Sequence, residues 1–376
     1  MKLLFVISKF EGGGAEGVMC TLCNELSKRG HDVTLISHFG KSVYSLNDEV
    51  CQIDYKTWQY DTSKGSMPVR IWKKIVNRYR DYIYLKHTIK EKQPDVVMSF
   101  LMWWLWQLIV LCKGRIPLVF CDRNAYVRPV GNTFLNKRIF FKYADVVQVM
   151  SHHDVAYLRN RYKKVVAMPN PLRFVPLSHE DYKNEFDARR NIIACGRLEP
   201  QKGFEKLIRA FSIIAEKYPS WDVDIYGQGK RGSDYPQLLE ELVDELGLSN
   251  RIHFMGYQKD LNNAMRDHSV FCLSSEFEGF PNVLSEAMAA GCACVSFDIV
   301  TGPREIIVDG LDGMIVEDQN IDALAEGLDT LMCDENLRYS FGLHAIEDIK
   351  RFSKDRVVEK WERMFESLIM DFRKDY

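Results

Sequence analysis

Short apolar runs alternate with amphipathic stretches along the whole sequence, and this alternation constrains the fold more than any other feature. Apolar runs of about four to eight residues are typical of strands buried in a parallel sheet, and the stretches between them have helical spacing. The first series of predicted strands is 2–8, 32–37, 95–100, 117–121, 146–150 and 164–167, and the second is 191–195, 222–226, 252–255, 270–273, 293–297 and 313–316. Two successive series of β-α units predict an α/β protein with two doubly wound parallel sheets.

A proline-rich segment separates the two series. Residues 168–190 read MPNPLRFVPLSHEDYKNEFDARR and show no clear period, which favours a linker. The expected domains are therefore 1–168 and 191–350, with the linker at 169–190, since 376 residues suit two hydrophobic cores. In the last part, 351–376, apolar residues recur on one helical face, which predicts a helix that packs against another element.

Charge is unevenly distributed, although the formal net charge is only −2. Residues 1–176 carry 27 Lys and Arg against 14 Asp and Glu, whereas the rest of the chain carries 23 against 38. A basic half beside an acidic half indicates that the N-terminal half meets an anionic surface or ligand. Chance and solvated helix faces are the alternative. The 46% hydrophobic content, with 27% charged residues, excludes a disordered chain.

The cysteines and acidic residues give no pattern typical of a metal site. Cys20 and Cys23 form a CxxC inside a helical pattern, without a second pair at zinc spacing. The DVD at 222–224 starts a strand instead of ending one, so it does not fit a metal-binding acid pair. We therefore expect no metal and no other cofactor, and we expect the ten cysteines to be reduced core residues of a cytoplasmic protein.

One long apolar stretch needs to be distinguished from a membrane-spanning helix. Residues 96–112, VVMSFLMWWLWQLIVLC, are at the short limit for crossing a bilayer and follow Pro94-Asp95. We interpret them as a buried strand at 96–100 followed by a helix at 101–113. The opening MKLLFVIS lacks a signal-peptide cleavage region and is expected to form the first strand.

Glycines follow the first predicted strand, in FVISKFEGGGAEG. Gly12, Gly13 and Gly14 precede a helix, where backbone N–H groups can approach an oxyanion closely. The glycines also fit a dinucleotide fingerprint, but the second strand ends LISHFG, without the acid that would hold a ribose. A phosphate contact is therefore favoured, and a tight turn without a ligand is the alternative.

Two cations follow the first strand of the second series, in IIACGRLEPQKGFEKLIRAF. Arg197 and Lys202 flank a turn that precedes a helix. A diphosphate would bind both, because the guanidinium offers a planar fork and the ammonium a point charge. A pair of ordinary surface charges is the alternative.

Two carboxylates flank a helix start in SSEFEGFPNVLSEAMAAG. Pro281 suits the first turn of a helix, which places Glu278 on the loop before it and Glu286 about one turn inside. The helix N-terminus between the two acids presents N–H groups to a phosphate. Glu286 can accept hydrogen bonds from a ribose diol and Glu278 can reach a sugar, so the pair fits the two ends of a sugar nucleotide. A capping acid plus an exposed helix acid is the alternative.

Seven segments together resemble glycosyltransferase family 4: GGGAEG, PNP, GRLEPQKGFEKLIRAF, YGQG, FMGY, SSEFEGFPNVLSEAMAAG and GPREIIVDGLDG. The resemblance covers nearly the whole chain and is most specific in the second half. It implies a GT-B fold, with two Rossmann-like domains facing across a cleft, no metal requirement, and a final helix that packs back on the N-terminal domain. It also implies a retaining glycosyltransferase that moves a hexose or N-acetylhexosamine from a nucleotide-diphosphate sugar, with UDP expected. The implied acceptor is a lipid-linked glycan or polysaccharide of cell-surface glycan synthesis, including lipopolysaccharide or capsule.

The resemblance also assigns roles to individual residues. The catalytic positions of the family correspond to Glu278, Arg197 and Lys202. The donor-binding positions correspond to Gly13, Gly14, Phe280, Pro281, Asn282, Val283 and Glu286.

One departure from the family concerns the acceptor side, where many relatives carry a His. The corresponding segment here, VFCDRNAY, has Arg123 and Asn124, which are expected to hold the sugar or the acceptor instead. The resemblance implies that retaining transfer needs little enzymatic base, because the departing phosphate oxygen can take the acceptor proton on the same face.

A basic amphipathic segment, VRIWKKIVNRYRDYIYLKHTIKEK at 69–92, predicts docking of the N-terminal domain on an anionic membrane. It carries eight Lys or Arg against two acids, and aromatic and apolar residues recur at helical spacing. This predicts a cytoplasmic protein that is peripheral on the inner face of the plasma membrane. A core-packed helix with a solvated basic face is the alternative, and we expect no nucleic-acid partner.

Three other classes of protein remain as alternatives. An epimerase of the same fold would need acids on both faces of the sugar, and an oxidoreductase would bind a reduced nicotinamide cofactor. A non-catalytic scaffold would tolerate changes at Glu278 and Arg197.

Overall fold

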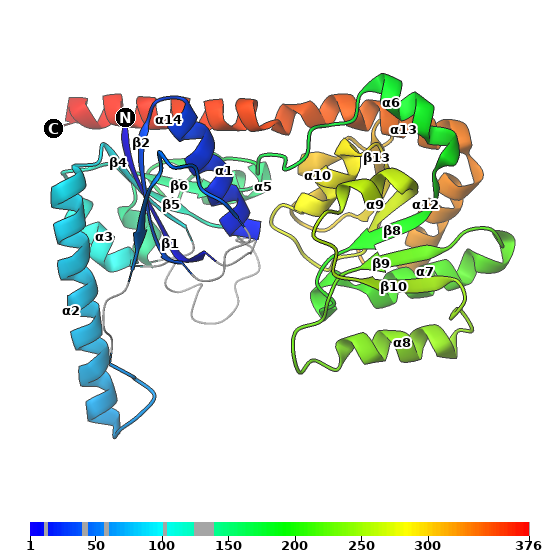
Figure 1. Cartoon of the computed structure of the whole chain (residues 1–376), viewed down its shortest axis with the longest axis horizontal. Coiled ribbons are helices and arrows are strands. Elements are labelled where there is room, and N and C mark those ends of the chain that lie inside the picture. The colour runs from blue at the N-terminus through cyan, green and yellow to red at the C-terminus, as the bar shows by residue number, and fades with distance from the viewer. Residues whose placement is uncertain (11–13, 40–43, 56–59, 101–103, 124–138, 376) are drawn as a thin grey trace. The chain divides into compact units, whose positions relative to one another are not determined.

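The chain forms two compact units, each built on one parallel sheet (Figure 1). The computed structural model describes residues 1–10, 14–39, 44–55, 60–100, 104–123 and 139–375. Unit 1 consists of Met1–Pro171 and Lys354–Tyr376, and unit 2 consists of Leu172–Ser353.

Unit 1 contains a seven-stranded sheet in the order β3-β2-β1-β4-β5-β6-β7, with parallel pairings throughout the described strands. The strands are β1 (Lys2–Phe10), β2 (Asp32–Phe39), β3 (Cys51–Asp54), β4 (Val96–Phe100), β5 (Leu118–Cys121), β6 (Val146–Val149) and β7 (Val165–Ala167). The helices are α1 (Gly14–Lys28), α2 (Met67–Lys92), α3 (Leu105–Cys112), α5 (His152–Leu158) and α14 (Lys354–Asp375), with a 3-10 helix at Phe141–Tyr143. The strand order reverses between β1 and β4, which is where open α/β sheets bind ligands.

All six strands predicted for the first half are present, and the sequence pattern missed β3. This strand has only four residues, CQID, which are only partly buried. It pairs with β2 alone, at the edge of the sheet. A short edge strand with mixed polarity lacks the continuous apolar run that locates the inner strands.

Unit 2 contains a six-stranded sheet in the order β10-β9-β8-β11-β12-β13, again with parallel pairings. The strands are β8 (Arg190–Cys195), β9 (Val223–Tyr226), β10 (Ile252–Gly256), β11 (His268–Leu273), β12 (Ala293–Phe297) and β13 (Gly313–Val316). The helices are α6 (His179–Glu185), α7 (Phe204–Ile214), α8 (Tyr235–Glu245), α9 (Asn262–Asp267), α10 (Asn282–Ala289), α11 (Pro303–Ile306), α12 (Ile321–Cys333) and α13 (Glu335–Asp348). Short 3-10 helices lie at Phe186–Ala188, Pro200–Lys202, Ala215–Lys217 and Ile349–Phe352. The six predicted strands are all found, and the predicted α/β class with two parallel sheets is confirmed.

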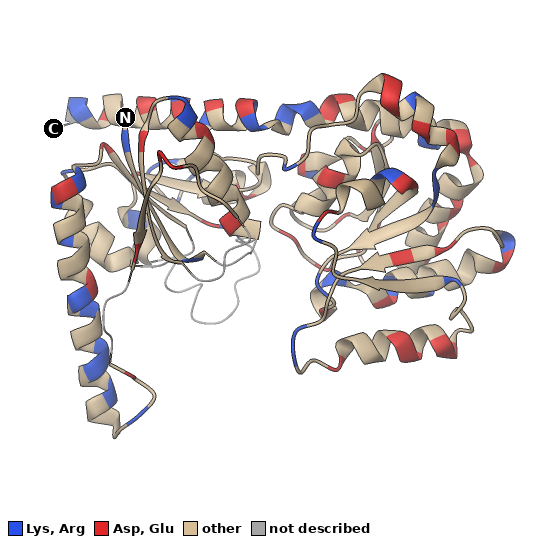
Figure 2. Cartoon of the chain, viewed as in Figure 1, with Lys and Arg blue, Asp and Glu red and all other residues tan. Residues whose placement is uncertain are grey.

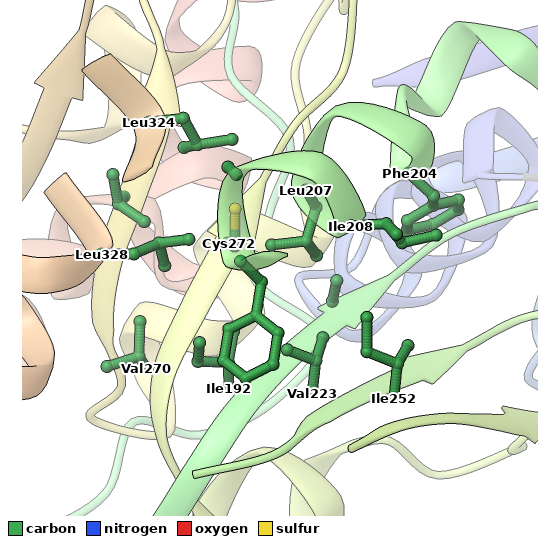
Figure 3. Packing of buried hydrophobic residues seen from close by; sticks show 14 of the residues in the cluster. Ile192, Phe204, Leu207, Ile208, Val223, Ile252, Val270, Cys272, Leu324 and Leu328 are labelled. Atoms are coloured by element: carbon green, nitrogen blue, oxygen red, sulfur yellow. The ribbon is translucent and has the colours of Figure 1, made fainter. Parts of the chain in front are cut away.

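The core of unit 2 explains why its strands could be located from the sequence. Leu207 of α7 and Leu324 of α12 lie over Ile192 of β8 and Val223 of β9, and all four side chains are fully buried (Figure 3). Strands covered in this way consist of near-continuous apolar residues, so each one is visible as an apolar run.

The segment 169–190, expected to be an irregular linker, contains α6 and a 3-10 helix. Ser178 caps α6 by accepting a hydrogen bond from the backbone N–H of Asp181 (3.0 Å), and Tyr182 is fully buried against Ile346 of α13. A helix of two turns is too short to show a period in the sequence. From Leu172 onward the segment is therefore part of unit 2.

Helix α14 belongs to unit 1, where its apolar face is covered. Trp361 and Phe365 are fully buried, and the Phe365 ring lies 6.0 Å from that of Phe5 in β1. Glu362 accepts a hydrogen bond from Arg29 Nη1 (2.9 Å), which adds a polar contact with the end of α1. The helical face seen in the sequence thus finds its partner in the first half of the chain.

The apolar stretch 96–112 divides into β4 and α3. The strand predicted at 96–100 is present, whereas the helix expected at 101–113 begins at Leu105, and residues 101–103 lie outside the described residues. Within the described ranges, every helix is either too short or too polar to cross a bilayer.

The cysteines are almost all interior residues. Cys51 is half-buried, Cys333 is exposed and the other eight are buried. Burial raises the pKa of the Cys20 thiol to about 11 and that of Cys292 to about 12. These thiols are held in the protonated, unreactive form.

Candidate functional site

The predicted catalytic residues of unit 2 lie on two loops at the carboxyl ends of neighbouring strands. β8 and β11 pair in the sheet, so the loops that follow them meet. The loop after β8 carries Arg197 and the 3-10 helix Pro200–Lys202, and the loop after β11 carries residues 274–281. This edge of a parallel sheet is where α/β proteins bind ligands.

Gly203 allows the two loops to approach each other closely. It adopts the left-handed conformation, with φ +60°, and a Cβ built there would lie 2.2 Å from the Ser274 carbonyl oxygen. Three hydrogen bonds to backbone carbonyl oxygens join the loops: Ser274 Oγ donates to Lys202 O (3.0 Å), Gln201 Nε2 to Phe277 O (2.9 Å) and Glu276 N to Gln201 O (2.9 Å). The two loops therefore behave as one rigid assembly, and a side chain at 203 would separate them.

Lys202 and Glu278 meet in a charge-assisted hydrogen bond. Lys202 Nζ donates to Glu278 Oε1 at 2.5 Å, and Ser275 Oγ donates to the same oxygen at 2.9 Å. The side chains of Lys202 and Glu278 are only 15% and 11% exposed, so solvent screens the pair weakly. Because both donors use Oε1, the second carboxylate oxygen can accept a hydrogen bond from a ligand.

A third loop supports the backbone around Glu278. Thr301 Oγ1 donates to the Glu278 carbonyl oxygen at 2.6 Å. Gly302, with φ +105°, lies so close that a Cβ built there would be 2.8 Å from the Pro281 ring and 3.3 Å from Glu278 Cβ. The GPRE segment that follows β12 thus packs directly under the loop that bears the acid.

Arg197 differs from Lys202 in its exposure. Its side chain is 69% exposed and, among the described residues, forms an ion pair only with Glu199, at 3.2 Å between Nη1 and Oε1. A pair this exposed holds the guanidinium weakly, so Arg197 can turn toward an anion. The sequence placed both cations on the same turn; the structure adds that one is already neutralised by Glu278 and the other is accessible.

Helix α10 starts immediately after the loop that carries Glu278. Pro281 is its N-cap, one position before the first turn expected for it from the sequence, and the helix begins at Asn282. The backbone N–H groups of Asn282 and Val283 lie in the first turn, where an α-helix provides no internal acceptor and the helix dipole favours an anion. Phe280 is buried, with its ring edge-on to Phe352 at 5.4 Å, which fixes the start of the helix.

Glu286 lies one turn into α10 and is 1% exposed. Its Oε1 accepts a hydrogen bond from Arg173 Nε at 2.5 Å, and its Oε2 has no hydrogen-bond partner among the described residues. Burial raises the pKa of this carboxyl, and the Arg173 guanidinium opposes that rise. Glu286 is therefore not the exposed helix acid of the alternative interpretation, and one of its oxygens has no hydrogen-bond partner among the described residues.

The residues predicted for unit 1 are placed less completely. Gly14 is the exposed first residue of α1, whereas Gly13 and Asn124 lie outside the described residues. Arg123 is buried: its guanidinium lies 4.9 Å above the Phe100 ring and donates to Asn170 Oδ1. Burial lowers the pKa of Arg123 to about 10. The guanidinium expected to hold sugar or acceptor is thus bound within unit 1.

Sequence reasoning did not assign Ser275, Thr301 or Arg173. Ser275 lies within a quoted motif and Thr301 directly precedes another, and hydroxyl groups near a carboxylate are a usable signal for hydrogen bonding. Arg173 gave no signal, since it is a single cation in the segment interpreted as a linker. In the described part of the chain, no group of three or more His, Cys, Asp or Glu could hold a metal ion.

Comparison with known families accounts for this arrangement. Residues 12–174 match the family model described as Glycosyltransferase Family 4, and residues 179–348 match the one described as Glycosyl transferases group 1. The chain belongs to glycosyltransferase family 4. The resemblance seen in the sequence is confirmed, and this family 4 protein is a glycosyltransferase enzyme.

The relatives that match this glycosyltransferase over nearly their full lengths include two that act in glycan synthesis. The GalNAc-alpha-(1->4)-GalNAc-alpha-(1->3)-diNAcBac-PP-undecaprenol alpha-1,4-N-acetyl-D-galactosaminyltransferase of Campylobacter jejuni is 28% identical, over 97% of this chain and 98% of that protein. The amylovoran biosynthesis glycosyltransferase AmsD of Erwinia amylovora is 27% identical, over 96% of this chain and 98% of that protein.

Solved structures show the same fold. Sucrose-phosphate synthase from Thermosynechococcus elongatus superimposes with a TM-score of 0.79 and 17% identity, over 98% of this chain and 99% of that one. Anabaena Alr3699/HepE in complex with UDP superimposes with a TM-score of 0.76 and 19% identity, over 98% of this chain and 100% of that one. The predicted GT-B fold class is thereby confirmed.

Proposed function

We propose that this glycosyltransferase moves an N-acetylhexosamine or hexose from a UDP-sugar to a lipid-linked glycan in the synthesis of a cell-surface polysaccharide. The names of the Campylobacter and Erwinia relatives support the acceptor class, since one acts on an undecaprenyl diphosphate glycan and the other serves amylovoran biosynthesis. UDP is present in the Alr3699/HepE structure. One observation carries the proposal: Lys202 and Ser275 both donate hydrogen bonds to the same oxygen of Glu278, beside the start of α10.

The proposed chemistry uses charge that is fixed before the substrate arrives. Lys202, Arg197 and the N–H groups at the start of α10 stabilise the charge that grows on the diphosphate as the glycosidic bond breaks. Glu278 orients the sugar through its second oxygen, and Glu286 accepts from the ribose. Removing one preorganised donor of this kind typically lowers turnover about 100- to 1000-fold.

We further propose that transfer retains the anomeric configuration and needs no metal ion. The departing phosphate oxygen would take the acceptor proton on the face from which it leaves, so the acceptor attacks from that same face. The cations Lys202 and Arg197, with the positive end of α10, would supply the charge that a metal supplies in other sugar transferases.

A donor panel followed by product analysis tests the proposed reaction. Thermal shifts are measured with UDP, GDP and ADP sugars, including UDP-N-acetylgalactosamine and UDP-glucose, and transfer is then assayed with undecaprenyl diphosphate glycans. We expect the largest shift with a UDP-sugar and a lipid product whose new linkage has the donor's anomeric configuration by NMR. Binding of a reduced nicotinamide, or epimerised donor without a lipid product, would overturn the proposal.

Helix α2 supports docking on an anionic membrane. Seven of the twenty large apolar side chains that are exposed in the described residues lie between Met67 and Ile83 of this helix, including Trp72 (52%) and Ile75 (62%). Lys and Arg recur along the same helix (Figure 2). A basic helix with exposed aromatic and apolar residues suits a lipid headgroup surface.

The inner side of α2 makes this interpretation more specific. Asn77 and Asp81 face the body of unit 1, where Asn77 bonds the Tyr60 backbone and Asp81 accepts from the Tyr55 hydroxyl. In the part of the helix before Tyr82 the buried residues are polar, and the exposed apolar residues lie among exposed Lys and Arg, whereas Leu85, further along, is buried in the core of unit 1. A helix packed on the core along its whole length would bury those apolar residues, so this arrangement favours placing the protein peripherally on the cytoplasmic face of the plasma membrane.

Vesicle flotation tests the membrane proposal. The intact protein is mixed with phosphatidylcholine vesicles with or without phosphatidylglycerol, and we expect binding that requires the anionic lipid and weakens with salt. Trp72→Ser with Ile75→Ser should lose binding, whereas Ile213→Ser with Leu238→Ser, at exposed apolar positions of unit 2, should not. Failure of the wild-type protein to bind anionic vesicles at low salt would favour a soluble acceptor.

A further inference from the structure

The turn between β13 and α12 contains a glutamine in an unfavourable backbone conformation. Gln319 has φ +58°, in the left-handed region that glycine adopts freely and that other side chains avoid. A residue held in such a conformation persists only where its surroundings impose it, and such residues gather at functional sites. The contacts of the Gln319 side chain show what holds it in this conformation.

The amide of Gln319 reaches the loop that precedes Glu278. Its Nε2 donates to the Ser275 carbonyl oxygen (3.4 Å) and to Asp318 Oδ1 (2.7 Å), and its Oε1 accepts from Lys206 Nζ. A glycine at 319 would relieve the backbone but would lose all three of these contacts.

Lys206, in the first turn of α7, completes the connection. Its side chain is only 16% exposed, and its Nζ donates to Glu276 Oε1 at 2.8 Å as well as to Gln319. Glu205 Oε1 lies 4.0 Å away, at the limit of an ion pair. One ammonium group thus joins the turn at 319 to the loop at 276.

The two side chains hold the residues immediately before Glu278. The Ser275 carbonyl oxygen accepts a hydrogen bond from Gln319 Nε2, and the Ser275 hydroxyl donates one to Glu278 Oε1. Glu276, held by Lys206, also donates its backbone N–H to Gln201, next to Lys202. Loss of either side chain would remove a contact that holds the loop just before Glu278.

We propose that Gln319 and Lys206 are positioning residues, which fix the 274–278 loop and thereby the carboxylate of Glu278 toward the donor sugar. This inference rests on the proposed function, in which Glu278 orients that sugar. The hydrogen bonds of the long Gln319 amide to Lys206 and Ser275 offset the cost of its unfavourable backbone conformation.

Four substitutions and one matched control test the proposal. Gln319→Gly removes the amide and the backbone conflict together, and Gln319→Asn keeps a shorter amide on a residue that tolerates the left-handed region. Lys206→Met removes the ammonium group, with its charge and its hydrogen bonds to Glu276 and Gln319, and keeps an unbranched apolar side chain. Gln319→Ala removes the amide and leaves the conflict. Gln93→Gly is the control, because Gln93 has φ +47° at the end of α2, in unit 1.

The expected result separates positioning from stability. With UDP-N-acetylgalactosamine as donor, Gln319→Gly and Lys206→Met should lower kcat on the order of ten- to hundredfold with little change in the affinity for UDP. Gln319→Gly should keep or raise the melting temperature. The kcat of Gln319→Asn should lie between that of Gln319→Gly and that of the wild type. Amide hydrogen exchange at 274–278 should accelerate in both low-activity variants, and Gln93→Gly should leave both kcat and this exchange unchanged.

Three outcomes would overturn the inference. Wild-type kcat in Gln319→Gly would show that the amide positions nothing, and unchanged exchange at 274–278 would show that it does not hold the loop. If the wild-type protein itself transfers no sugar, the proposed function fails and this inference fails with it. If the wild type is active and the variants match it, only this inference fails.

Discussion

The Lys202–Glu278 pair should act as one unit in catalysis, and a double-mutant cycle can measure this. Lys202→Met is the suitable change, because the Lys202 stem packs over Gly196, where a built Cβ would lie 3.1 Å from it, and Met preserves that contact. Glu278→Gln keeps the shape of the carboxylate and removes its charge. The cycle compares both single variants with the double variant.

The structure sets the expected size of the coupling. At 2.5 Å and an effective dielectric constant of about 20, Coulomb's law gives a gross attraction of roughly 7 kcal/mol. Removing two charges from water offsets most of this, and measured couplings between contacting residues are roughly 0.5–3 kcal/mol. Because the side chains are only 15% and 11% exposed, we expect about 2 kcal/mol, or about 30-fold in rate.

The assay is kcat/KM for transfer from UDP-N-acetylgalactosamine. Lys202→Met should lower kcat/KM about 100- to 1000-fold, as the removal of other preorganised donors does. Glu278→Gln should lose roughly 10- to 150-fold, the range for a hydrogen bond to a charged group. The double variant should retain about 30 times more activity than the product of the single effects predicts. Lys217→Met is the control: it removes a 58% exposed cation whose Nζ lies 2.6 Å from Asp329 Oδ1, and kcat/KM should not change. Strictly multiplicative effects would refute the idea that the pair acts as a unit.

Three further predictions concern the same site. Arg197→Ala should leave the melting temperature unchanged, because the side chain is exposed, and lower turnover about 100-fold; near-wild-type transfer would remove Arg197 from the diphosphate site. The raised pKa of Glu286 means that its contribution to stability is full below the ordinary glutamate pKa of about 4.3 and is lost as pH rises through the folded value. Glu286→Gln should therefore melt higher than the wild type at pH 8, with no such gain near pH 4, and should raise the donor KM; equal melting at both pH values would contradict this. Activity should persist in EDTA, and complete loss that Mg²⁺ or Mn²⁺ restores would show a metal requirement.

The strands and the loops of the site could be predicted because burial leaves a clear record in the sequence. Inner strands are covered on both faces and are therefore apolar throughout, whereas the edge strand β3 is half-exposed and was missed. Lys202 and Glu278 were both identified, and the pairing of β8 with β11 brings their loops together. Lys202 and Ser275 donate to the same oxygen of Glu278, and this arrangement depends on side-chain rotamers that no local sequence pattern encodes.

Other features of the site depend on contacts between distant segments. Arg173 and Glu286 are far apart in the sequence, and the arginine lies in a segment that has no period. The conformation of Gln319 could not be anticipated, because a glutamine carries no signal for positive φ. The resemblance to the family assigned Arg123 to the sugar or the acceptor, but its burial over Phe100 follows from packing that the sequence does not report.

The burial of the cysteines gives this protein a natural site for chemical labelling. Cys333, at the end of α12, is the exposed thiol, whereas eight others are enclosed and Cys51 is half-covered. A maleimide dye should therefore attach first at Cys333, on unit 2 and away from the loops that carry Lys202 and Glu278. Fluorescence anisotropy of that dye would report vesicle binding, because a vesicle-bound protein tumbles more slowly, and this needs no engineering of the cysteines.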